Sequence, residues 1–109
     1  MRYEVRVLPA AQADVHMCAE FIARDNLTAA LRFYDAVERT WLGLANNPRR
    51  WSQYELEQPR LRELRKVSVD GFKNYLLFYH VVGDVVEVMR VVHGARDLPS
   101  VLADDLAKE

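Results

Sequence analysis

The stretch that decides the fold runs from Tyr75 to Pro99 and reads YLLFYHVV-GD-VVEVMRVVHGARDLP. Two runs rich in valine, leucine and aromatic residues flank Gly83-Asp84, a two-residue turn signal, because glycine adopts the positive φ that a primed hairpin turn requires. Neither run carries a polar residue at every second position, as is typical of strands covered on both faces. The stretch therefore predicts a central β-hairpin, and its exit from His93 to Asp97 is dense in polar groups.

Pairing outward from the turn gives each hairpin side chain a cross-strand neighbour. With Gly83 and Asp84 as the loop, the expected pairs are Val82–Val85, His80–Glu87, Tyr79–Val88, Phe78–Met89, Leu77–Arg90 and Leu76–Val91. A β-bulge would shift every pair beyond it by one residue and exchange the two faces of the sheet.

The same pairing sorts the hairpin side chains into two faces. The more aliphatic face is expected to pack on helices, and it carries Tyr75, Leu77, Tyr79, Val81, Val86, Val88, Arg90 and Val92. The other face mixes apolar and ionisable groups and is the better candidate for meeting a partner; its members are Leu76, Phe78, His80, Glu87, Met89, Val91 and His93. Because an unpaired guanidinium is costly on a buried face, Arg90 is expected to reach a carboxylate or backbone carbonyls as a structural anchor.

The remaining chain predicts two helices and two further strands. Residues 3–8 alternate like a strand, and residues 61–69 form a weaker strand candidate. Helical spacing covers residues 10–24 and 27–45, and Asn26 is a good N-cap for the second helix. That second helix is expected to bury a seam of Ala30, Tyr34, Val37, Trp41 and Leu44.

The element order is therefore β-α-α-β-β-β, followed by a short C-terminal helical tail after Asp97. An antiparallel sheet with the N-terminal helical hairpin packed on one face is the simplest way to bury both the helical seam and the aliphatic sheet face. This predicts an α+β fold class. With 109 residues, the chain is expected to form a single domain spanning 1–109.

Composition and the distribution of charge bear on the kind of partner. The net charge of −1 does not suggest a nucleic-acid binder. A local basic run stands out, however, and it indicates either an anionic partner or a solvated strand and loop; it consists of Arg49, Arg50, Arg60, Arg62, Arg65 and Lys66.

The reactive residue types do not form a known site. The single cysteine, Cys18, allows no disulfide within the chain, which fits a reducing cytoplasm. The three histidines fall in separate expected elements, and no glycine-rich phosphate loop is present, so we expect no metal and no cofactor. No apolar run approaches the roughly 20 residues of a membrane span, and the chain begins as a strand rather than a signal peptide, so a cytoplasmic protein without membrane contact is expected.

Two motifs in this element order resemble a known family. The residues Phe72-x-x-Tyr75-Leu76-Leu77-Phe78-Tyr79 and Val88-x-Arg90-Val91-x-His93-Gly94-x-Arg96-Asp97 are similar to those of the RelE/ParE superfamily of type II toxin–antitoxin toxins. The alanine-rich entry to the second helix, Thr28-Ala29-Ala30, and the Asn-Pro stop after it also look like this family. The resemblance covers nearly the whole chain.

The resemblance implies one of two activities. RelE-like members cut mRNA in the ribosomal A site without a metal, whereas ParE-like members poison DNA gyrase so that cleaved DNA persists. RelE-like members commonly carry an arginine where this chain has Leu76, and no terminal tyrosine follows His93. The resemblance therefore favours a ParE-like gyrase inhibitor that is not an enzyme. Its cognate antitoxin would fold on it, laying a helix along the helical hairpin and often adding a strand to the sheet.

Two alternatives stay open. The first is an mRNA endoribonuclease acting on the ribosome, with an acid–base pair and phosphate-binding cations drawn from His93, Glu87, Arg65 and Arg96. It requires these side chains to converge on one exposed face. The second is a degenerate toxin that binds only its antitoxin. The candidates for contacting a partner are Arg62, Arg65, His80, Glu87, Met89, His93 and Arg96.

Overall fold

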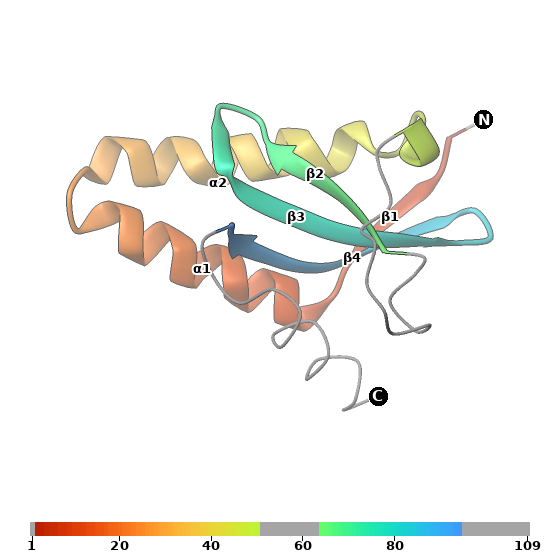
Figure 1. The fold of residues 1–109 in the computed structure, drawn as a ribbon, viewed down its shortest axis with the longest axis horizontal. Helices are drawn as coiled ribbons and strands as arrows, with labels where there is room; N and C mark the ends of the chain where they lie inside the picture. The colour runs from red at the N-terminus through yellow and green to blue at the C-terminus, as the bar shows by residue number, and fades with distance from the viewer. Residues whose placement is uncertain (1, 51–63, 95–109) are drawn as a thin grey trace.

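A computed structural model describes residues 2–50 and 64–94 of the chain. Two helices pack on one face of a four-stranded sheet (Figure 1). In chain order the elements are β1 (Glu4–Val7), α1 (Pro9–Ala23), α2 (Leu27–Gly43), the short 3₁₀ helix η1 (Pro48–Arg50), β2 (Arg65–Val69), β3 (Phe72–Val82) and β4 (Val85–His93). The predicted α+β fold with a helical hairpin is confirmed. The expected helical tail lies outside the described residues.

The sheet is mixed rather than purely antiparallel, which corrects the expected topology. Its strand order is β1-β4-β3-β2. Both β2–β3 and β3–β4 pair antiparallel, but β1 runs parallel to β4, with Glu4 opposite Val85. Parallel neighbours need a crossover connection instead of a tight turn, and here the helical hairpin supplies part of it. The alternation within residues 3–8 indicates a strand but carries no information on its direction.

The predicted hairpin register holds near the turn and fails beyond a bulge. Val82–Val85, His80–Glu87 and Tyr79–Val88 pair as expected. The register then shifts, so that Phe78 lies opposite Arg90 and Met89 is the extra residue of a β-bulge. The expected pairs Phe78–Met89, Leu77–Arg90 and Leu76–Val91 are therefore wrong.

The bulge also exchanges the faces of the last residues of β4. Val91 now lies opposite Leu77 and His93 opposite Tyr75, so both belong to the helix-covered face instead of the mixed one. Val91 is 1% exposed and joins the core beneath the helices, and Val92 is not in that core cluster. Side-chain alternation in a strand has a period of two, so one inserted residue is enough for this exchange.

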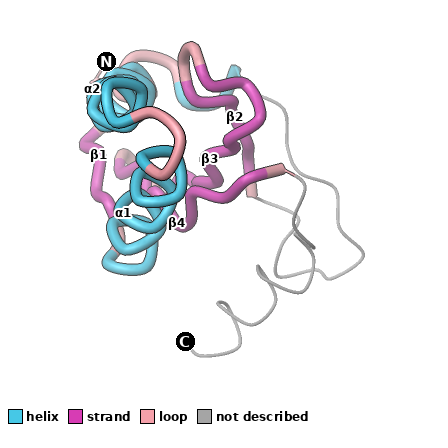
Figure 2. The backbone as a smooth tube through the Cα atoms, turned by 90° about the vertical axis from the view of Figure 1, so that its left-hand side faces the viewer, coloured by secondary structure: helices cyan, strands magenta, loops and turns pink. Residues whose placement is uncertain are grey.

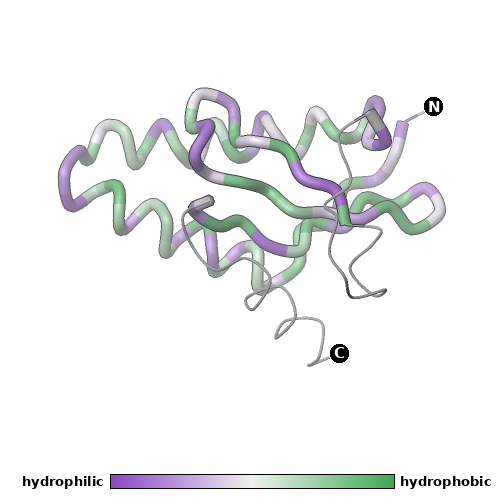
Figure 3. The backbone as a smooth tube through the Cα atoms, in the orientation of Figure 1, coloured by the Kyte–Doolittle hydropathy of each residue, from purple (hydrophilic) through white to green (hydrophobic). Residues whose placement is uncertain are grey.

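The core lies between the helices and the central strands (Figure 2). Figure 3 shows hydrophobic residues concentrated along β3 and β4 and alternating with hydrophilic ones along both helices. At its centre the fully buried Phe33 ring meets Phe72 and Tyr75 edge-on, with centroids 5.2 and 5.1 Å apart. Such contacts between aromatic rings add to the stability gained from burial alone.

The buried stripe of α2 is centred one residue away from the predicted seam. Ala30, Val37 and Leu44 are buried as expected, but Phe33 is fully buried and Tyr34 is 37% exposed. The 3.6-residue period places Phe33 at the middle of the stripe and Tyr34 at its edge, where the hydroxyl lies 2.9 Å from Nδ1 of His16 on α1. The expected N-cap is confirmed, since Asn26 Oδ1 accepts a hydrogen bond from Ala29 N at 2.9 Å.

A buried ion pair joins α1 to β4. Asp14 Oδ2 and Oδ1 accept hydrogen bonds from Arg90 Nε and Nη2 at 2.6 and 2.9 Å, and Oδ2 also accepts one from Val91 N at 2.9 Å. The expectation that Arg90 reaches a carboxylate is confirmed. The pairing of β1 with β4 ends at Val88, and beyond that point Asp14 and the Cys18 thiol (3.9 Å from Val91 O) bond to the β4 backbone.

Candidate partner-binding surface

The face of the sheet opposite the helices, called the outer face below, carries a network of ionisable side chains that contact one another along β1, β3 and β4. His80 Nε2 lies 2.7 Å from Glu87 Oε1. Nη1 of Arg6 lies 4.0 Å from Glu87 Oε2, and Nη2 of Arg6 donates a hydrogen bond to Glu4 Oε2 at 2.7 Å. The side chains of His80 and Glu87 are 29% and 24% exposed, so a partner could reach this pair. Each of the two side chains already contacts the other.

His93 lies on the other side of the sheet. Its ring meets that of Tyr75 at 5.0 Å, nearly perpendicular. Both line a cavity of about 470 Å³ between α1 and the end of the sheet, together with Met17, Cys18 and Phe21. Burial raises the pKa of the Tyr75 hydroxyl above its ordinary value, and the nearby Cys18 thiol raises it further.

Arg65 begins β2 opposite Tyr79, and its guanidinium donates to the carbonyl of Arg49 at 3.1 Å. Tyr79 and Tyr75, the strand neighbours of Arg65 and His93, are four residues apart on β3, which is about 13 Å along a strand.

These positions separate the residues proposed for nuclease chemistry. Glu87 is on the outer face, whereas His93 and Arg65 are on the helix-covered face at different ends of β3. A general acid and base must lie within hydrogen-bond reach of one reacting group. Within residues 2–50 and 64–94, the three side chains do not converge. Arg62 and Arg96 lie outside the described residues.

Met89 is not a surface residue. As the extra residue of the bulge it is only 3% exposed. Met89 is therefore not accessible to a partner in this conformation. Among the partner-binding candidates that the structure describes, His80 and Glu87 are accessible on the outer face and His93 in the cavity beside α1.

The helical hairpin exposes large apolar side chains that sequence reasoning did not single out. They are 53–66% exposed and comprise Met17 and Phe21 on α1 and Leu27, Leu31 and Leu42 on α2. Met17 and Phe21 are one helical turn apart and line the same cavity as His93. Their exposure could have been predicted from the sequence, because these residues fall outside the buried stripe of each helix. Met17 and Phe21 thus share one apolar surface with that cavity, and exposed apolar patches are typical of sites that meet another protein.

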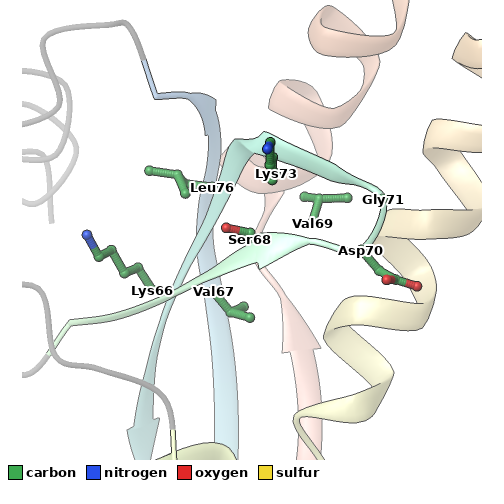
Figure 4. Close-up of a pocket in the computed structure, with 8 residues that line it drawn as sticks. All are labelled: Lys66, Val67, Ser68, Val69, Asp70, Gly71, Lys73 and Leu76. Atoms are coloured by element: carbon green, nitrogen blue, oxygen red, sulfur yellow. The ribbon is translucent and has the colours of Figure 1, made fainter.

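An open groove of about 480 Å³ crosses β2 and β3 on the outer face; we call it the β2–β3 groove and define it by the residues labelled in Figure 4. Lys66 and Lys73 extend from the two strands, and Ser68 lies between them (Figure 4). Asp70, at the turn, bonds Arg39 Nε through Oδ2 at 3.3 Å. Its backbone N–H also donates to Thr40 Oγ1 at 3.0 Å, which fixes the turn against α2.

Two further properties concern the described part of the chain alone. No group of three or more His, Cys, Asp or Glu side chains there is arranged to hold a metal ion. None of the helices there is long and apolar enough to cross a membrane.

Comparison with known proteins gives a family match and a set of similar folds. Residues 5–98 match the family model described as the ParE toxin of type II toxin–antitoxin system, parDE. A search of curated protein sequences finds no match.

Solved structures that share the fold include the following three. A chain of the chromosomal ParDE system from P. aeruginosa superposes with a TM-score of 0.68 at 13% identity, covering 84% of this chain and 96% of that one. The toxin–antitoxin complex RelBE2 of Mycobacterium tuberculosis gives 0.60 at 22% identity, with 88% and 95% covered. The E. coli toxin RelE, as a double arginine-to-alanine mutant in the free state, gives 0.62 at 15% identity, with 99% and 98% covered. At these identities the likeness concerns the fold.

Proposed function

This chain belongs to the ParE toxin family of type II toxin–antitoxin systems, and we propose that it inhibits DNA gyrase. The observation that carries the proposal is the match to the ParE toxin model over residues 5–98, nearly the whole chain. ParE-like toxins poison gyrase so that cleaved DNA persists. The proposed target places the activity in the cytoplasm.

The arrangement of ionisable side chains supports a toxin that is not a nuclease. His93, Glu87 and Arg65 lie on different faces or at different ends of the sheet, and so do not form one acid–base site. The remaining candidate pair, His80 and Glu87, is joined to Arg6 and Glu4 in one network of polar contacts. A structural role in pairing β1, β4 and β3 accounts for that network.

We also propose that a cognate antitoxin neutralises this toxin through the helical hairpin. The exposed Met17 and Phe21 on α1, and Leu27 and Leu31 on α2, offer an apolar surface to an amphipathic helix. Two of the solved structures that share the fold come from a ParDE system and from a RelBE2 toxin–antitoxin complex. An antitoxin that covered this surface would remove its apolar side chains from water.

The first test is induction of this chain alone in bacterial cells, with separate readouts of the DNA-damage response and of bulk mRNA integrity within minutes. Gyrase poisoning predicts filamentation and a damage response while mRNA stays intact. Purified gyrase should then accumulate cleaved DNA complexes when the toxin is added. Rapid cleavage of ribosome-bound mRNA would overturn the proposal in favour of the endoribonuclease.

A matched pair of variants sharpens that test. His80→Ala and Glu87→Ala each remove one member of the accessible ionisable pair of the outer face. Any loss of gyrase poisoning in either variant should be no larger than its loss of folded protein. Loss of toxicity in both variants, with their folded state retained, would point to chemistry at this pair. Growth unaffected by the wild-type chain would favour a toxin that binds only its antitoxin.

A further inference from the structure

The cavity beside α1 has apolar walls and an open rim. Met17 and Phe21, one turn apart on α1, are 61% and 58% exposed, and both line the cavity described above. The two charged residues of its rim, Glu20 and Arg24, have opposite signs, so charge alone does not select an occupant. The exposed apolar area favours an occupant that covers it with apolar side chains of its own.

The described chain ends at the edge of this cavity. β4 ends at His93, a lining residue, and Gly94 N then donates to Asn74 O at 2.7 Å, next to Tyr75, which also lines the cavity. A Cβ on Gly94 would lie 3.3 Å from the same carbonyl oxygen, so the chain leaves the strand in close contact with β3. Residues 95–109 lie outside the described residues, and they continue from this point.

The sequence of residues 95–109 has the pattern of a short amphipathic helix. Asp97 suits the N-cap position, and Pro99 suits the first turn. Four apolar side chains follow the spacing i, i+3, i+4, i+8, which places them on one face of a helix. They are Leu98, Val101, Leu102 and Leu106. A helix this short is marginal in water by itself, so its formation depends on burial of that face.

We propose that this C-terminal tail is the occupant, and that it folds as a helix whose apolar face is buried in the cavity beside α1. Residues 95–97 separate Gly94 from Leu98, and an extended chain advances about 3.3 Å per residue, so Leu98 can lie up to about 13 Å from Gly94. A helix of about ten residues is about 15 Å long, which is enough to cover Met17 and Phe21. Because the tail is tethered at the cavity's edge, its docking is an intramolecular event at an effective concentration of about millimolar.

A docked tail would bury Met17 and Phe21 in the free toxin. Among the described residues, Leu27 and Leu31 of α2 are not part of the cavity wall, so the α2 part of the antitoxin surface proposed above would stay exposed. The inference does not depend on whether the toxin's target is gyrase, because it concerns the isolated chain.

Cys18, the single cysteine of the chain, lines the cavity and therefore reports on its occupancy. The first measurement is the rate at which Cys18 of the full-length chain reacts with the thiol reagent DTNB. Leu102→Asp places a charge on the apolar face of the tail, and it should raise this rate about tenfold or more, the factor expected from the burial of one leucine side chain. Ser100→Asp is the matched control: it adds the same charge on the opposite face and should leave the rate at the wild-type value.

Two results of this measurement would overturn the docking. One is an equal rate in the wild type and in Leu102→Asp. The other is an equal acceleration by both aspartate variants, because that effect would not depend on the face of the tail. Urea titrations followed by circular dichroism show whether a faster reaction reflects lower global stability instead of an opened cavity.

A disulfide test locates the tail without adding a charge. Val101→Cys, Leu102→Cys and Leu106→Cys each put a second thiol on the apolar face, whereas Ser100→Cys and Ala107→Cys put one on the opposite face. A disulfide with Cys18 requires that the two Cα atoms come within about 7 Å. Under mild oxidation, at least one apolar-face variant should close a disulfide within the chain about tenfold faster than either control, as seen on a non-reducing gel.

The disulfide test also separates the other occupants of the cavity. Disulfides that join two chains instead of closing within one would overturn the assignment to the chain's own tail in favour of a second copy. If none of the apolar-face variants forms a disulfide faster than the controls, the cavity is open in the isolated chain and the tail does not occupy it.

Discussion

Replacing Asp14 with alanine tests how much the buried ion pair between α1 and β4 stabilises the fold. Asp14 accepts two hydrogen bonds from Arg90 and one from Val91 N, and the two side chains are only 7% and 16% exposed. Removing one partner of such a pair costs about 3–5 kcal/mol because the remaining charge loses its compensation. For a chain of this size, a loss of that order lowers Tm by about 15–30 °C. Urea denaturation followed by circular dichroism measures it directly as a fall in the midpoint at constant m.

Two comparisons separate the ion pair from the backbone bond. The double variant Asp14→Leu/Arg90→Met removes both charges, so it should lose only the cost of the unsatisfied Val91 N–H, about 1–3 kcal/mol. The single variant should therefore be less stable than the double one. Arg39→Ala breaks the exposed pair with Asp70 and should change the free energy of unfolding by less than about 1 kcal/mol. If Asp14→Ala costs no more than Arg39→Ala, the reasoning from burial is refuted.

Three further predictions concern the core, the helix cap and alkaline pH. Phe33→Ala should lower the free energy of unfolding by about 3–5 kcal/mol in urea titrations, because the ring is fully buried against Phe72 and Tyr75, whereas Tyr34→Ala should cost much less. Asn26→Ala should cost about 1 kcal/mol by loss of the N-cap bond to Ala29, and glycine at position 26 should restore most of it in the same titration. The raised pKa of Tyr75 means that its contribution to stability is complete below pH of about 10 and is lost as the pH rises through the folded-state pKa. The Tm of Tyr75→Phe, measured by thermal melts, should therefore fall less steeply than the wild-type Tm as the pH rises above about 10. Equal slopes of Tm against pH for the two proteins would contradict this.

Local patterns predicted the elements of this fold because the information for them is local. Helical spacing, the Asn26 cap and the Gly83-Asp84 turn each depend on residues within a few positions, and all three match the structure. The anchoring of Arg90 by a carboxylate was also predictable, since a buried guanidinium requires a partner. The identity of that partner, Asp14, was not, because it lies 76 residues away.

The β4 bulge coincides with a contact between residues far apart in the sequence. The run from Val88 to Val92 is apolar on both sides of Arg90, so its sequence fits either register. The Asp14 carboxylate accepts from the side chain of Arg90 and from the backbone of Val91 at once. These two hydrogen bonds to one carboxylate are compatible with the bulged strand. The bulge in turn carries His93 to the helix-covered face, so His93 and Glu87, two members of the alternative nuclease site, do not share the outer face.

The bond from Val91 to Asp14 also bears on folding during synthesis, because it cannot form until β4 has been synthesised. The two residues are 77 positions apart, and a ribosome adds about 5–20 residues per second. The interval between synthesis of Asp14 and synthesis of Val91 is therefore about 4–15 s. The same delay applies to β1, whose only neighbour among the described strands is β4. Until β4 emerges, the helical hairpin lacks the strand that joins β1 and β3 in the complete sheet. Ribosomes that stop early on this message therefore release fragments that lack the toxin's fold.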